Sequence, residues 1–403
     1  MKKLTSFIGK CEKGNIAIAT AIMMPLLVGG AGFGVETAYW FYQDSQLQQA
    51  SDKAVYTAAI EKRAGSTTQK ILSAATTTAT ENGYTPGTIV INYPPTMGAY
   101  AGNATAIEAQ LTREVPRFFT AIFTTAPIID NARAVAIMQS SADACVLALS
   151  KTASRAAQVT GSGNLNLTGC TVMSNSIATD SVYVQGAAQM SADCIIAVGD
   201  VSLKTGSTTT TCTKKAITNV SPASDPYASL PVPTSAINIP NTNGAILQPG
   251  NYVNGMNLSG TKILSPGVYI VSSGSFKINA NANILGTGVT IYIAAGVSVS
   301  MNGSATVNLS APTTGTYAGM LFFGDRNGTA GVTFNGTAAS KLTGAIYFAN
   351  QDVSYLGNFS GNGGCTRVVA KTIVWSGNTS ISQNCTAFGM ANIPALQIVK
   401  LVE

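Results

Sequence analysis

Residues 266–293 read PGVYIVSSGSFKINANANILGTGVTIYI and contain two short apolar runs, each opened by a glycine and separated by turns rich in Asn and Ser. The pattern recurs along the chain, and its opening glycines lie 21, 31 and 25 residues apart: Gly267, Gly288, Gly319 and Gly344. Irregular coils of roughly 20–30 residues, each made of a few strands joined by turns, are typical of a β-solenoid. The sequence therefore predicts a right-handed parallel β-solenoid. A β-sandwich, whose strands recur roughly every 8–12 residues, is the alternative.

The predicted solenoid domain covers residues 141–403, because short β runs broken by Gly, Asn and Ser begin near Ala142. A stretch near residues 221–240 interrupts this pattern with five prolines, at positions 222, 226, 231, 233 and 240. We interpret this stretch as a strap that crosses from an early set of rungs, Val146 to Leu203, to the main set.

Composition narrows the class of protein. Only 10% of the 403 residues are charged, against about 25% in an average chain, so Ser, Thr and Asn must keep the surface soluble. The net charge is +6, and residues 1–15 contribute +3 of it through four Lys and one Glu. The rest of the chain carries about +3, which is too little for a nucleic-acid-binding surface.

The residue inventory also argues against catalysis. The chain contains no histidine, which removes the Ser-His-Asp and Cys-His arrangements and the commonest metal ligand. A polysaccharide-active β-helix enzyme is the serious alternative, but such enzymes need clustered carboxylates. Beyond Asp225 the acidic residues are Asp325, Asp352 and Glu403, and Asp325 lies in a turn-forming sequence. We therefore expect no enzymatic activity, no catalytic residue, no cofactor and no metal site.

Asn15 to Val35 form an uncharged apolar stretch, NIAIATAIMMPLLVGGAGFGV. Its length suits one bilayer crossing as a helix, at about 1.5 Å per residue across roughly 30 Å. Lysines precede it at positions 2, 3, 10 and 13, with Glu12 as the one acid. Because Lys and Arg stay on the cytoplasmic side, we predict a cytoplasmic leader over residues 1–14 and a body that crosses outward. A cleaved signal peptide is the alternative, but its apolar region is usually shorter, about 7–15 residues.

Particular residues mark the predicted span and its outer end. Pro25 perturbs the helix, and Gly30 and Gly34 form a Gly-x-x-x-Gly pair of the kind that associates helices. Glu36 follows the span directly. We expect it to cap the span at the membrane interface, and a contact with a partner protein is the other interpretation.

Residues 36–140 are predicted to form a helical and α/β neck. Its first part continues as an amphipathic helix with a narrow face of mostly small residues, comprising Leu47, Ala50, Ala54 and Ala58. These side chains permit close packing, either of a partner's helix or of this protein's own next domain.

Local signals predict the remaining elements of the neck. A second helix is expected over Thr68–Glu81, stopped by an Asn-Gly pair. Strands are expected over Thr88–Tyr93 and Ala106–Leu111, then a short helix over Pro116–Phe123 and a third strand over Ile128–Met138.

Cysteine usage agrees with export. Cys11 lies on the predicted inner side, and an even number lie on the outer side: Cys145, Cys170, Cys194, Cys212, Cys365 and Cys385. An oxidising compartment permits disulfides, and several connectivities are open. Proximity in sequence favours Cys145–Cys170, Cys194–Cys212 and Cys365–Cys385. A zinc site lacks both C-x-x-C spacing and histidine.

Residues 14–17 read Gly-Asn-Ile-Ala, an apolar span with one proline comes next, and Leu47–Ala54 read LQQASDKA. With their basic lead, these features resemble the N-terminal module of TadE/TadG-like Flp (Tad) pilus-assembly proteins. Residues 115–138 are similar to the segment on the C-terminal side of this module in that family. The sequence DPYASLP at 225–231 and the Pro-Gly-x-Tyr turns, such as residues 249–252, are similar to TadG-like exported regions.

The resemblance implies a single-pass protein of the bacterial inner membrane, with a cytoplasmic N-terminus and a periplasmic body. Its implied role is to assemble or anchor a Tad pilus without chemistry of its own. The expected partners are Tad pilus-assembly proteins or pilus subunits, engaged by the span and by helix contacts at Glu36, Leu47, Ala50, Ala54 and Ala58. An envelope adhesin, or a glycan- or surface-binding β-solenoid, is the alternative from another class.

Two patterns of related proteins are missing from this sequence. Asp200–Lys204 and Asp352–Leu356 lack the final serine of the Asp-x-Ser-x-Ser metal motif that some TadG-like proteins carry. Processed pseudopilins have Glu at the fifth position after a glycine, whereas the fifth residue after Gly14 is Ala19. We therefore expect neither that metal site nor packing into a pilus fibre core.

Overall fold

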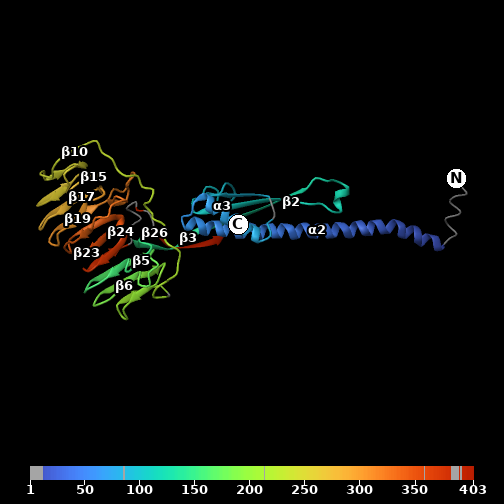
Figure 1. Ribbon diagram of the computed structural model, residues 1–403, viewed down its shortest axis with the longest axis horizontal. Helices are drawn as coiled ribbons and strands as arrows, with labels where there is room; N and C mark the ends of the chain where they lie inside the picture. Colours follow the sequence, from blue (N-terminus) through green and yellow to red (C-terminus); the bar gives the residue numbers. More distant parts are fainter. Residues whose placement is uncertain (1–11, 85–86, 213, 358, 383–389, 391–392) are drawn as a thin grey trace. The chain divides into compact units, whose positions relative to one another are not determined.

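The structure, a computed structural model, describes residues 12–84, 87–212, 214–357, 359–382, 390 and 393–403 (Figure 1). The chain divides into two compact units, Met1–Gln139 with Val399–Glu403, and Ser140–Ile398. The last five residues thus return to the first unit, which the predicted domain of residues 141–403 did not anticipate.

Two helices form one layer of the first unit. α2 (Glu12–Arg63) runs without a break from the predicted span into the neck. α3 (Thr68–Glu81) has the bounds expected from the sequence. The Thr67 hydroxyl caps α3 by accepting a hydrogen bond from an amide of its first turn. Gly83 follows the helix end with a φ of 86°, which glycine adopts without strain.

An antiparallel sheet forms the second layer of this unit. β1 (Thr88–Asn92) pairs with β2 (Ala106–Val115), and β2 pairs with the first part of β3 (Ile128–Ala148). The C-terminal residues extend the sheet, because the Val135 N–H donates to the Glu403 carbonyl at 2.8 Å. Alternate residues of β2 and β3 face the helices, as their period of two requires. The buried core between the layers comprises Leu47, Ala50, Ala54, Val55, Ala58, Ala59, Ile71, Ala75, Ala79, Tyr84, Ile107, Ala109, Leu111, Ala132, Ala134, Ala136 and Met138.

The loop between β2 and β3 differs from the expected structure. It contains one turn of 3₁₀ helix, η1 (Thr120–Ile122), where the sequence predicted a helix over Pro116–Phe123. In an α-helix the Thr120 N–H would bond to the Pro116 carbonyl. It donates instead to the Glu36 carboxylate of α2, at 2.7 Å, so the loop follows α2 rather than coiling on itself.

The second unit is a parallel β-solenoid of about ten turns, as the sequence predicted. Neighbouring rungs pair in parallel, which excludes the antiparallel β-sandwich. The early rungs comprise the second part of β3, β4 (Ala157–Val159), β5 (Asn164–Ser174), β6 (Val182–Val184), β7 (Gln189–Ala197), β8 (Val201–Leu203) and β9 (Thr208–Thr210). The main rungs comprise β10 (Asn238–Ile239), β11 (Ile246–Leu247), β12 (Gly250–Tyr252), β13 (Met256–Leu258), β14 (Thr261–Leu264), β15 (Gly267–Val271), β16 (Ser275–Ile278), β17 (Asn283–Thr287), β18 (Val289–Ile293), β19 (Ser298–Met301), β20 (Thr306–Ser310), β21 (Met320–Gly324), β22 (Val332–Phe334), β23 (Lys341–Tyr355), β24 (Phe359–Trp375) and β25 (Thr379–Ser382), and β26 (Ile393–Leu401) follows them.

Inward-facing side chains at matching positions stack from rung to rung. Phe334, Tyr355 and Trp375 occupy equivalent positions of β22, β23 and β24. The ring centroids lie 5.4 Å apart between Phe334 and Tyr355 and 6.0 Å apart between Tyr355 and Trp375. Because adjacent parallel strands lie about 4.8 Å apart, equivalent aromatic rings contact and fill the interior.

The order of the rungs in space differs from their order in the chain. β24 pairs with β3 through Val368 and Val146, and with β4 through Ile373 and Ala157. The last main rung therefore stacks on the first early rung, and the chain enters the stack in its middle (Figure 1). The strap joins the two ends of the stack, a connection much longer than the step between consecutive rungs.

The strap is fastened to the outer face of the rungs by polar contacts. The Asn175 side chain donates to the Ala223 carbonyl and accepts from the Ala223 amide, both at 2.8 Å. The Tyr347 hydroxyl donates to Asp225 at 2.7 Å, and the Arg326 guanidinium donates to the Tyr227 carbonyl at 2.6 Å. The strap also contributes apolar side chains, because Tyr227 belongs to one buried cluster with Tyr292 of β18 and Phe323 of β21. All five residues of β18, and all five of β21, are buried.

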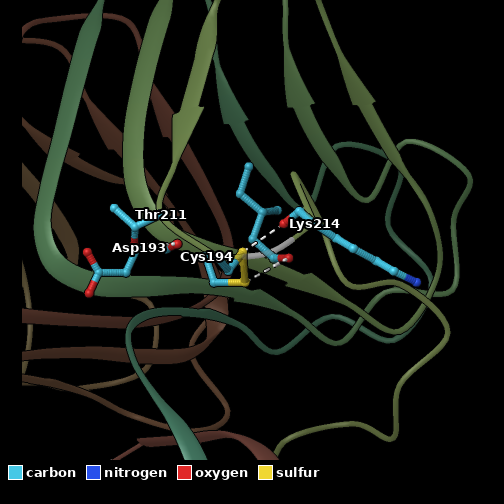
Figure 2. Close-up of a disulfide and its surroundings, with 6 residues drawn as sticks. Asp193, Cys194, Thr211 and Lys214 are labelled. Atoms are coloured by element: carbon cyan, nitrogen blue, oxygen red, sulfur yellow. Dashed lines mark hydrogen bonds between the residues drawn. A yellow bond between two sulfur atoms is a disulfide. The ribbon is translucent and has the colours of Figure 1, made fainter.

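Two disulfides join early rungs. Cys145 bonds Cys170 and Cys194 bonds Cys212, with Cα–Cα separations of 5.6 Å and 5.4 Å. Figure 2 shows the second of these at the end of the early set, where the Thr211 hydroxyl donates to the Asp193 carbonyl at 3.2 Å. These are two of the three cysteine pairs that proximity in sequence favours. The third expected pair includes Cys385, which lies outside the described residues, as does Cys11.

Candidate functional site on the N-terminal helix

The first part of α2 is apolar and uncovered. Ile22, Leu26 and Leu27 are 63%, 68% and 69% exposed, although such side chains are normally buried in a water-soluble unit. Pro25 lies inside this segment, and the helix continues through it. Among the described residues, α2 is the one helix that is long and apolar enough to cross a membrane, judged by length and composition.

The predicted span residues fall on this uncovered segment. Gly30 and Gly34 have open space where a Cβ would stand, so no part of the described chain packs on that face. Val35, the last residue of the span, is 65% exposed. The side chain of Asn15, the first, lies outside the described residues.

The second part of α2 is packed inside the first unit. Leu47, Ala50, Ala54 and Ala58 are each fully buried, in a core shared with α3 and the sheet. The protein's own second helix and sheet occupy this face. The alternative interpretation, docking on its own next domain, describes this face. Small side chains are present because they allow α3 to approach closely.

Glu36 lies at the boundary between the two parts, and its side chain is 1% exposed. Its carboxylate accepts hydrogen bonds from the Phe118 amide at 2.6 Å, the Thr120 amide at 2.7 Å and the Thr120 hydroxyl at 2.9 Å. A buried carboxylate is tolerated only when such partners replace water. Glu36 therefore fastens the β2–β3 loop to the helix, rather than facing a partner protein.

The β2–β3 loop presents large apolar side chains to solvent. Phe118, Phe119, Ile122 and Phe123 are 55%, 48%, 85% and 86% exposed. Figure 1 shows the loop extending beyond the sheet along α2. Sequence reasoning missed this surface because it treated Pro116–Phe123 as an ordinary helix. The signal was available in two adjacent apolar pairs, Phe118-Phe119 and Ile122-Phe123, separated by only two residues.

A cavity of about 300 Å³ opens between α2 and the base of this loop. Its lining combines apolar side chains with two carboxylates: Thr37, Trp40, Phe41, Asp44, Val115, Ile128 and Asp130. Arg113, which is 3% exposed, pairs with Asp130 at 3.3 Å. Burial raises the pKa of Asp130 and the nearby Asp44 carboxylate adds to this, against the opposing effect of Arg113.

The late carboxylates considered for catalysis each have a local partner. The Tyr292 hydroxyl donates to Asp325, and the Thr372 hydroxyl donates to Asp352 at 2.6 Å. Glu403 belongs to the first unit, where it pairs with Arg133. Within the part of the chain that the structure describes, no group of three or more His, Cys, Asp or Glu side chains is arranged to hold a metal ion.

These features define a class of protein: an exposed, apolar N-terminal helix that continues into an α/β unit, followed by a β-solenoid. Residues 14–61 match the model of a family described as putative Flp pilus-assembly TadE/G-like, or Tad. The match covers most of α2 and supports a pilus-related role. No curated protein and no solved structure matches the chain.

Proposed function

We propose that this protein is a non-enzymatic assembly or anchoring protein of a Tad/Flp pilus. The observation that carries the proposal is that two features fall on the same stretch of chain. Residues 14–61 match the Tad family, and the same stretch contains the apolar segment that the rest of its unit leaves uncovered. Residues 15–35 then serve as a single membrane anchor in the bacterial inner membrane.

The proposed topology places the N-terminus in the cytoplasm and both units in the periplasm. The lysines ahead of the span favour this orientation under the positive-inside rule. The two disulfides of the solenoid also favour a periplasmic location, because the periplasm is oxidising and the cytoplasm is not. A signal peptide that is cleaved would leave no anchor, so the retained helix is part of the proposal.

The proposed mechanism is binding, with the two units in different roles. The anchor and the uncovered residues of α2 just beyond it, Phe41 (79% exposed) and Tyr42 (58% exposed), engage Tad assembly proteins or pilus subunits. The buried small-residue face takes no part. The solenoid serves as a stiff spacer or docking wall, because ladders of parallel strands and a filled interior resist bending.

The yield of surface pili tests this proposal. Pili would be sheared from a strain deleted for the gene and from the same strain complemented with the full chain. We expect loss of pili on deletion and their return on complementation. Normal pili in the deletion strain would reject the assembly role and favour the envelope-adhesin alternative.

The topology has a separate test. Alkaline phosphatase, which is active only in the periplasm, would be fused after Glu403 of the full chain. High phosphatase activity in the membrane fraction is expected. Activity in the soluble periplasmic fraction would indicate cleavage of the N-terminal segment, and an inactive, membrane-bound fusion would indicate the opposite orientation.

A further inference from the structure

The β2–β3 loop lies along one face of α2, at the outer end of the proposed span. Phe119 is packed so closely on Gly32 that an added Cβ would lie 2.5 Å from its ring. Phe118 is fastened to Glu36 and makes an edge contact with the Tyr39 ring at 5.2 Å between centroids. Positions 32, 36 and 39 are spaced by four and three residues and share one helix face. The loop is therefore positioned by the helix along its axis.

These contacts set the depth of the loop relative to the proposed span. Gly32 precedes the end of the span, Val35, by three residues, which is about 5 Å along the helix axis. Phe119 therefore lies level with the last turn of the span. If Val35 marks the edge of the apolar layer, this ring lies inside that layer.

The composition of the loop suits lipid better than water. No charged residue occurs from Phe118 to Ile129, and the side chains of Ile122 and Phe123 are more exposed than that of Leu27 in the span. The cation that precedes this stretch, Arg117, has its guanidinium 5.6 Å from the Trp40 ring. Large apolar side chains capped by Trp and Arg are typical of segments that lie in a membrane interface.

Part of the loop's backbone is hydrogen-bonded within the protein rather than left for water. Five amides have partners within the protein: those of Phe118 and Thr120 bond Glu36, those of Phe123 and Thr124 bond the Thr120 carbonyl, and that of Ala126 bonds the Thr124 hydroxyl. The Ala126 carbonyl accepts from Arg117 at 2.8 Å. A backbone that enters lipid must satisfy its polar groups internally, whereas a solvated loop has no such need.

We propose that residues 118–123 insert into the periplasmic leaflet of the membrane beside the span. This inference rests on the proposed anchor and adds a second membrane contact to it. The bound surface is the lipid itself: acyl chains meet Ile122 and Phe123, and the headgroup region meets Arg117 and Trp40. The span and the inserted loop are then two membrane contacts, joined to each other through Gly32 and Glu36. Together they fix the rotation of the helix about its axis and the orientation of the first unit on the membrane surface.

Photo-crosslinking to lipid tests the proposal in the full chain. The photoreactive residue p-benzoylphenylalanine would replace Phe123, Phe33 or Met97, one at a time, in protein reconstituted into nanodiscs of phosphatidylethanolamine and phosphatidylglycerol. Phe33 lies in the span and is the positive control. Met97, 52% exposed, lies in the β1–β2 loop at the opposite end of the sheet and is the matched negative control. We expect lipid adducts of comparable yield at positions 123 and 33, and no lipid adducts at position 97.

The three positions separate the ways in which the proposal can fail. Absence of adducts at position 33 would overturn the anchor and the loop insertion together. Adducts at position 33 without adducts at position 123 would overturn the loop insertion and leave the anchor intact. A protein adduct at position 123 in whole cells, in place of lipid, would show that the loop docks on another protein and would also overturn the proposal.

Discussion

The two parts of α2 have opposite fates. Residues 16–35 leave large side chains such as Leu26 and Leu27 uncovered, whereas residues 47–59 bury mainly alanines in a core. The difference lies in where the apolar residues fall. In the first part they surround the helix, and in the second they follow one face. A helix that is apolar all round needs an apolar medium, while a one-sided helix needs only a neighbour.

The largest expected effect comes from a charge in the uncovered part. Leu27→Arg should weaken membrane insertion by about 2.5–3.5 kcal/mol, the cost of Arg at the centre of a helical span. Membrane association would be measured by carbonate extraction of the full chain. Leu72→Arg, at a 40% exposed position of α3, is the matched control and should remain membrane-bound. Equal extraction of the two variants would contradict the assignment of the span.

The next effect comes from enlarging the buried face. Ala54→Leu should destabilise the first unit by roughly 1–3 kcal/mol, because its site is fully buried against α3 and the sheet. Thermal unfolding, followed by protease sensitivity of the first unit in detergent, would measure the loss. Tyr56→Leu, on an exposed position of the same helix, should be close to neutral. An Ala54→Leu variant of unchanged stability would mean that this face is open after all.

Acid should weaken the packed unit through Glu108, whose side chain is fully buried beside Arg133 at 2.5 Å. Burial opposes its ionisation, but hydrogen bonds from Asn92, Arg133 and Thr96 outweigh burial and lower the pKa to about 2, from an ordinary 4.5. A lowered pKa stabilises the fold above pH 4.5, and the stabilisation is lost as the pH falls towards 2.

Glu108→Gln tests that assignment. It should cost roughly 1–2 kcal/mol at neutral pH, because a charged acceptor becomes neutral, and should reduce the acid dependence of unfolding. Hydrogen exchange of the β2 amides at several pH values would follow both effects. An acid dependence as steep in the variant as in the unchanged chain would assign it to another carboxylate. Residues 16–35 of α2 contain no acid, so their hydrogen exchange should not depend on protonation of a carboxylate within that segment.

The smallest expected effect distinguishes neighbouring glycines at the boundary. Gly34→Ala meets open space and should stabilise the helix by up to about 1 kcal/mol, since alanine loses less backbone entropy than glycine. Gly32→Ala should gain less, because the Phe119 ring has to move aside. The lipid adduct at position 123 should also fall in Gly32→Ala alone. Identical behaviour of the two variants would show that the position of the Phe119 ring does not depend on the absence of a side chain at Gly32.

Short-range patterns predicted several elements well. The Asn-Gly stop of α3 and the glycine-opened strands of the solenoid depend on local backbone preferences, which short sequence patterns reveal. The stacking of β24 on β3 was not predictable in the same way. This pairing joins Val368 to Val146, which lie far apart in the chain. Any strand at an exposed end of the stack has the same unpaired backbone groups, so the local sequence does not select the partner.

The candidate site shows the same division. The spacing of Leu47, Ala50, Ala54 and Ala58 predicts a packed helix face, but it does not distinguish a partner's helix from the protein's own next domain. The pattern of residues 116–123 predicts a helix, whereas the structure has a loop whose partner, Glu36, lies about 80 residues earlier in the chain. A hydrogen bond between such distant groups leaves no periodic trace in the sequence.

The sequence by itself determined the apolar stretch of residues 15–35, the Tad-like helix that continues from it, and the parallel solenoid, because each depends on the spacing of residue types within one or two turns or rungs. Only the tertiary structure decided which face of α2 is covered, where the last rung docks, and how Glu36 positions the β2–β3 loop beside the apolar part of α2. Those outcomes depend on which distant groups meet, and many pairings satisfy the same local pattern until burial and hydrogen bonding select one.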